Sequence, residues 1–121
     1  MKFVQRVFVI AGIYGVVTLV PQYFMEASTG RDFPPAITHP EFFYGFIGVA
    51  LAWQVLFFII ARDPVRYRLA ILPAALEKIG FGAAGIILYL QGRVATQMLA
   101  FGSVELVFAA LFLIAFRKTP S

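Results

Sequence analysis

Four apolar stretches, each about twenty residues long, limit what this chain can fold into. They cover residues 7–25, 42–61, 69–91 and 98–116. A stretch of this length crosses the hydrocarbon core of a bilayer as a helix, because backbone groups in lipid must find their hydrogen bonds within the segment. The sequence therefore predicts an all-α polytopic integral membrane protein: one transmembrane domain, residues 1–121, built as a four-helix bundle.

The composition argues against a soluble domain of this size. Hydrophobic residues make up 61% of the chain and charged residues only 13%, whereas soluble domains have about 45–50% apolar and about 25% charged residues. The net charge of +4 does not indicate nucleic-acid binding, because the basic residues gather at the ends of the apolar stretches. The absence of cysteine excludes disulfides, thiolate metal sites and thiol redox chemistry.

The basic residues also predict an orientation. Alternation of the four helices puts seven of them on one side of the membrane: Lys2, Arg6, Arg62, Arg66, Arg68, Arg117 and Lys118. Only Arg31 and Arg93 fall on the other side. Because lysine and arginine are enriched on the cytoplasmic side, we expect an N-in, C-in protein of the inner (plasma) membrane, with residues 26–41 as its longer outer loop.

Two glutamates within the apolar stretches are the candidate catalytic residues. Glu77 lies about 12 Å from the cytoplasmic boundary, and the depth of Glu105 differs from it by about 8 Å. A carboxylate in hydrocarbon costs at least about 2.5 kcal/mol, so each must face the bundle interior, pair with a cation or bind a proton. The structural alternative pairs Glu77 with Lys78, or with Arg66 or Arg68 reaching in from the boundary, and lets Glu105 bond a neighbouring helix.

Five further residues are candidate ligand-binding residues. Tyr14 and Gln54 lie at one depth of about 10 Å, and Trp53 would shape a pocket beside them. His39 and Glu41 lie at the outer mouth, where the imidazole would donate or accept a proton. Gln54 also fits a hydrogen bond between helices. One histidine cannot build a histidine-rich metal site, so no metal is predicted, and no cofactor is indicated.

Small residues accompany both glutamates. Gly80 shares a helix face with Glu77, and Gly102 shares one with Glu105. Small residues let helix backbones approach closely, so these faces are expected to pack against other helices. The alternative is that glycine beside glutamate leaves space for a ligand.

The segment ARDPVRYRLAILPAALEKIGFGAAGIILY carries a family resemblance. A basic turn feeds a helix that has an internal glutamate followed by small residues. This pattern resembles small bacterial four-helix membrane proteins of the DoxX-like group, which implies a four-helix bundle and supplies no catalytic residue. The layout is also distantly similar to the sterol-isomerase and sigma-2-receptor group. Proteins of that group hold acidic residues in a membrane pocket, and the resemblance implies that such a pocket would be formed here by His39, Glu41, Glu77 and Glu105.

Three functions remain open at this point. The first is a non-enzymatic protein, either an accessory subunit or a bundle that binds a lipophilic small molecule. The second is an enzyme that moves a double bond in a lipophilic substrate, with Glu77 and Glu105 as acid and base. The third is a proton-coupled transporter, for which four helices would have to oligomerise. The expected partners are the lipid bilayer, a lipophilic small molecule, and a larger membrane complex or further copies of the chain.

Overall fold

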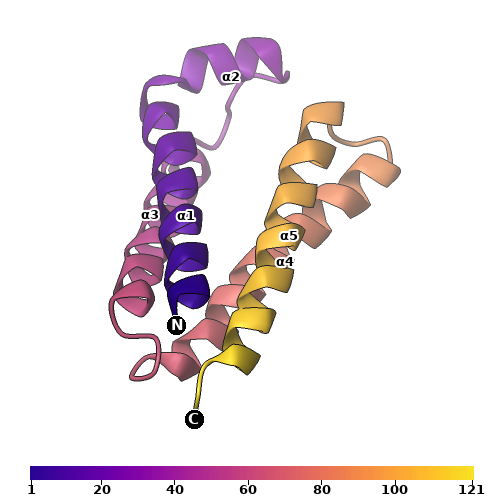
Figure 1. Cartoon of the computed structure of the whole chain (residues 1–121). Coiled ribbons are helices and arrows are strands. Elements are labelled where there is room, and N and C mark those ends of the chain that lie inside the picture. Colours follow the sequence, from indigo (N-terminus) through magenta and orange to yellow (C-terminus); the bar gives the residue numbers. More distant parts are fainter.

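The chain folds entirely into helices. The computed structural model describes all 121 residues, and its helices are α1 (Lys2–Leu19), α2 (Glu26–Asp32), α3 (Pro40–Arg62), α4 (Ile71–Leu90) and α5 (Thr96–Lys118) (Figure 1). Two short 3-10 helices, η1 (Val20–Phe24) and η2 (Arg68–Ala70), follow α1 and precede α4. With these extensions, four helices of 23 residues are long and apolar enough to cross a membrane. The predictions of an all-helical fold and of four such helices are confirmed.

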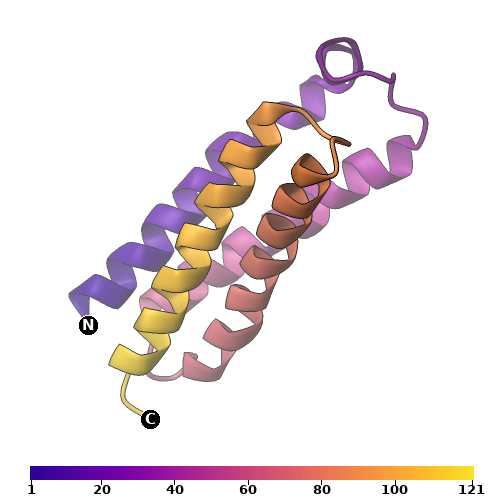
Figure 2. The same cartoon turned by 90° about the vertical axis from the view of Figure 1, so that its right-hand side faces the viewer.

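The four long helices form two hairpins. The first pairs α1 with α3 and the second pairs α4 with α5, while direct contact between α3 and α4 is sparse. Figure 1 shows the hairpins close together at the end that carries both chain termini, called here the terminal end, and apart at the opposite end beside α2. Figure 2 shows α4 and α5 lying side by side along most of their length. The bundle is therefore splayed rather than evenly packed.

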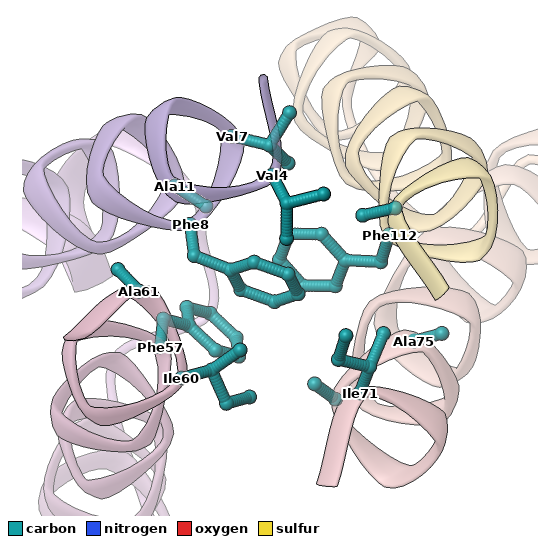
Figure 3. Packing of buried hydrophobic residues seen from close by; sticks show 12 residues of the cluster. Val4, Val7, Phe8, Ala11, Phe57, Ile60, Ala61, Ile71, Ala75 and Phe112 are labelled. Atoms are coloured by element: carbon teal, nitrogen blue, oxygen red, sulfur yellow. The ribbon is translucent and has the colours of Figure 1, made fainter. Parts of the chain in front are cut away.

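The shared core lies near the terminal end. Three phenylalanines from different helices form its centre: the ring of Phe8 stacks on that of Phe112 at 4.3 Å, and Phe57 meets Phe112 edge-on at 5.0 Å (Figure 3). Small and branched residues surround them, namely Val4, Val7, Ala11, Ile60, Ala61, Ile71, Ala74, Ala75 and Ala115. A second, smaller cluster of Leu19, Ile47 and Ala50 belongs to the first hairpin alone. Buried apolar packing thus joins the two hairpins mainly near the terminal end, and farther along α4 a stacked pair of half-exposed rings, Phe46 and Phe81 at 5.9 Å, also connects them.

Proline and glycine account for the helix boundaries. Pro40 occupies the first position of α3, where its missing amide is tolerated, and Pro64 follows the end of α3 at Asp63. Gly92 ends α4 with a φ of 71°, and the next amide, that of Arg93, donates to the carbonyl of Leu88. A residue in the left-handed conformation, followed by a hydrogen bond back to the last turn, is a common helix ending. Glycine adopts this conformation without strain.

The connection at residues 26–41 differs from the expected loop because it contains α2. This short helix has Glu26 in its first turn and Arg31 in its last, charges that suit the helix dipole. The Tyr44 hydroxyl donates a hydrogen bond of 2.8 Å to Glu26 Oε1, which ties α2 to α3. A Cβ on Gly30 would lie 3.0 Å from Ala36 Cα, so the segment folds back closely on itself.

Candidate functional site

Lys78 lies at the centre of a buried ion cluster. Its side chain is only 1% exposed, and its Nζ lies 2.7 Å from Glu105 Oε2 on α5 and 3.9 Å from Glu77 Oε2. These three residues are called here the ion triad. One lysine thus lies within ion-pair distance of both predicted glutamates. The two carboxylates do not pair with each other directly, which agrees with the different depths expected from the sequence.

Aromatic rings enclose the lysine. Nζ lies 5.2 Å from the ring centroid of Phe57 on α3 and 5.4 Å from that of Phe108 on α5. A cation at this distance from a ring face is attracted by the ring quadrupole, more strongly when water is absent. Phe57 also belongs to the shared core, and Lys78 follows the core residue Ala75 by one turn of α4. The ion triad therefore lies at the edge of the shared core.

The carboxylates of the ion triad are not fully satisfied. Glu77 Oε2 and Glu105 Oε2 are both buried and neither accepts a hydrogen bond. The contact between Lys78 and Glu105 has the distance of a hydrogen bond but not its angles, so it is an ion contact with acceptor capacity to spare. The two glutamate side chains remain 17% and 16% exposed. Fully ionised, the ion triad carries one net negative charge.

A close crossing of α4 and α5 positions the ion pair. A Cβ on Gly82 would lie 2.9 Å from the carbonyl oxygen of Gly102 and 2.8 Å from Leu106 Cγ. Gly82 is one turn after Lys78, and Gly102 is one turn before Glu105. Glycine at both positions lets the two backbones touch. The same spacing brings the ammonium of Lys78 to the carboxylate of Glu105.

The glycine faces differ from the sequence-based expectation. Gly102 does pack against another helix, as expected. Gly80, the expected partner of Glu77 on a packed face, has nothing near the position of a Cβ. The buried face of α4 instead carries Lys78, Gly82 and Gly85.

Gln54 is buried at a different contact. The residue is only 1% exposed, and its Nε2 donates a hydrogen bond of 2.8 Å to the Ala50 carbonyl of its own helix. Its Oε1 accepts no hydrogen bond. A Cβ on Gly15 of α1 would overlap the Gln54 amide group. Gln54 thus joins α1 and α3 by packing, without the hydrogen bond between helices that its polarity suggested.

The other predicted site residues divide into two groups. The ring of Tyr14 lies 5.4 Å from that of Phe108, which places Tyr14 beside the aromatic enclosure of Lys78. Trp53 is half-buried against the shared core. His39 and Glu41 lie apart from the ion triad at the start of α3, where His39 Nδ1 and Glu41 Oε1 are 3.2 Å apart and both side chains are exposed.

The arginines do not reach Glu77. Arg68 donates from Nε to the Thr119 carbonyl at 2.8 Å and lies over the ring of Phe116, while Arg66 lies over Tyr67. Of the proposed cationic partners of Glu77, only Lys78 is close, at 3.9 Å.

Lys78 is the member of the ion triad that the sequence did not indicate as a site residue. From the sequence, Lys78 was expected only to neutralise Glu77, its neighbour in the chain. The available signal was its spacing: Lys78, Gly82 and Gly85 recur every three or four residues and so share one face of α4. A lysine on the face that carries the closest-packing glycines points into the bundle.

Comparisons of the chain with protein-family models, curated proteins and solved structures returned no match.

Proposed function

We propose that this chain is an integral membrane protein that binds a lipophilic small molecule between its two hairpins. The observation that carries the proposal is the ion triad, with its buried Lys78 and its two partly exposed carboxylates. Ionisable groups at this depth are costly and are functional-site candidates by default. Glu77 Oε2 accepts no hydrogen bond from the protein, and Glu105 Oε2 meets only the Lys78 ammonium.

The position of the ion triad supports a lipophilic ligand. It lies next to Phe57 of the shared core, and the two hairpins separate toward the end beside α2 (Figure 1). An apolar ligand body would occupy the space that lipid tails otherwise fill. A polar head with a hydrogen-bond donor would meet the exposed part of the Glu77 and Glu105 carboxylates. Tyr14 and Phe108 would line the approach to that head.

Acid–base catalysis on such a ligand is the second candidate. Two carboxylates contact one lysine, so the ion triad holds groups that differ in charge and environment within a short reach of each other. Positioned acids and bases of this kind move protons on a bound substrate. Glu77 is the proposed base, because its contact with Lys78 is the longer of the two. Trp53 and Gln54 support the surrounding helix and do not contact the reacting groups in this proposal.

Membrane sidedness is part of the proposal. The terminal end carries seven lysines and arginines against the single acid Asp63. Because such residues favour the cytoplasmic side, we place both termini inside, in the inner (plasma) membrane of a bacterium. The His39–Glu41 pair then lies on the outer surface.

Native mass spectrometry on protein extracted gently from its own membrane tests the proposal. We expect the wild-type chain to carry a bound small lipophile, and Glu77→Gln to lose it. Glu41→Gln is the matched control, since it makes the same chemical change at an exposed carboxylate away from the ion triad. Equal ligand retention in both variants contradicts the proposal. A stoichiometric protein partner in place of a lipophile would favour an accessory subunit.

A further inference from the structure

The terminal end carries uncompensated positive charge. Seven basic side chains lie there, and none of them is within ion-pair distance of a carboxylate. Asp63, the one acid at this end, accepts from the backbone amide of Arg66 at 3.3 Å and so caps a turn. These arginines and lysines are therefore available to anions outside the protein.

Arg68 differs from the other cations because it is held in place. Its Nε donates to the Thr119 carbonyl at 2.8 Å, and its guanidinium carbon lies 3.8 Å from the centroid of the Phe116 ring. Thr119 is itself buried and donates from its hydroxyl to the Ala115 carbonyl. The two terminal nitrogens of Arg68 make no hydrogen bond with the protein. A fixed guanidinium with free N–H groups loses little entropy when it binds an oxyanion.

A surface hollow joins this arginine to a second one. It is lined by Val65, Arg66, Tyr67, Arg68, Leu69 and Ala70, together with Ser121. The guanidinium of Arg66 lies 5.5 Å from the Tyr67 ring centroid and is otherwise free. Val65 and Leu69 are 50% and 72% exposed, so bare apolar surface adjoins the two cations. The hollow lies at the start of the third of the four helices that are long and apolar enough to cross a membrane. A helix that spans the bilayer has its end near the lipid headgroups.

We propose that this hollow binds the headgroup of an anionic phospholipid, with Arg66 and Arg68 on the phosphate and Leu69 against the acyl chains. Guanidinium groups pair with phosphate oxygens through parallel N–H bonds. The adjoining apolar side chains favour a lipid over a free anion, because acyl chains can pack against Val65 and Leu69 whereas a soluble phosphate makes no apolar contact. Basic pockets at the cytoplasmic ends of membrane helices suit anionic lipid headgroups. This site is separate from the ion triad and does not depend on it.

The test uses the full chain in nanodiscs of phosphatidylglycerol and phosphatidylcholine in equal amounts. Native mass spectrometry counts the lipids that remain bound after release from the disc. We expect the wild type to retain phosphatidylglycerol over phosphatidylcholine, and Arg66→Gln/Arg68→Gln to retain at least about tenfold less of it. Arg62→Gln/Arg117→Gln is the matched control, because it removes two charges from the same end outside the hollow.

Two results would overturn the proposal. If the control loses as much phosphatidylglycerol as Arg66→Gln/Arg68→Gln, the attraction is a diffuse charge effect. If inorganic phosphate displaces the lipid at millimolar concentration, the hollow is a site for free anions. The double variant also removes the hydrogen bond from Arg68 to Thr119 and could unfold the chain end. The single variant Arg66→Gln avoids this problem, because the Arg66 side chain contacts only its neighbour Tyr67. This single variant must still lose phosphatidylglycerol selectively.

Discussion

Lys78 on α4 and Glu105 on α5 meet in an ion contact of 2.7 Å, with the lysine almost completely buried. The close approach of Gly82 to Gly102 one turn away brings the two helices together at this point. The stability of the second hairpin and the chemistry of the proposed ligand site therefore depend on the same pair of residues.

Removing one partner of this pair is expected to destabilise the protein strongly. Lys78→Met leaves Glu105 without its cation in an apolar environment, at a cost of about 3–5 kcal/mol. Lys78→Met/Glu105→Leu removes both charges and keeps the volume, so it should recover most of that loss. Unfolding in mixed micelles would measure both variants. Equal destabilisation by the single and the double change would show that the pair contributes by packing alone.

A second prediction concerns the close crossing of α4 and α5. Gly82→Ala places a Cβ against the Gly102 carbonyl and Leu106, and the resulting strain is expected to cost about 1–3 kcal/mol. Gly80→Ala is the matched control, since nothing lies near a Cβ there. That control should be neutral, or more stable by about 0.5–1 kcal/mol, because alanine favours the helix. Thermal melting in detergent separates the two variants, and similar losses in both would contradict the glycine crossing.

A third prediction concerns the contact between Gly15 and Gln54 in the first hairpin. Gly15→Ala should destabilise the protein, because its Cβ overlaps the buried amide of Gln54. Adding Gln54→Ala should relieve part of that loss by removing the overlapping group. Gly45→Ala has open space around its Cβ and serves as the control. If the double variant is no more stable than Gly15→Ala, the strain lies elsewhere.

The proposed orientation is testable by labelling, because the chain has no native cysteine. Thr38→Cys lies in the connection between α2 and α3, and Ser121→Cys lies at the terminal end; both positions are exposed. In intact cells, a maleimide that cannot cross membranes should label Thr38→Cys alone. Ser121→Cys should react only after lysis. The reverse pattern would place both termini outside and would invert the orientation proposed here.

The long helices follow from the sequence, and the rotation of each helix does not. Twenty apolar residues suffice to predict a span, because lipid forces the backbone into helix. A helix that is apolar on all sides gives a weak indication of which face points inward. Gly80 was therefore expected on a packed face beside Glu77, whereas the structure buries the face with Lys78 and Gly82. Tertiary packing of α4 on α5 decides this rotation.

Two further features could not be predicted from the sequence, for physical reasons. The helix α2 is too short and too polar to produce an apolar period, and its bond from Tyr44 to Glu26 joins residues 18 positions apart. The contact of Lys78 with Glu105 was not predicted because Lys78 was expected to pair with Glu77 alone. The contact depends on the register of α5 against α4, which the packing of Gly82 on Gly102 sets.

We propose that the ion triad holds a ligand and does not act only as a structural lock. The most direct test is the occupancy of bound lipophile in Lys78→Met/Glu105→Leu, measured by native mass spectrometry beside the wild type. This double variant removes both charges of the closer pair. Glu77, which is 17% exposed, loses only its longer contact of 3.9 Å with Lys78, so folding is expected to survive while the site is lost. We predict a folded protein without the lipophile found on the wild type. A folded double variant that retains the lipophile at wild-type occupancy would contradict the claim.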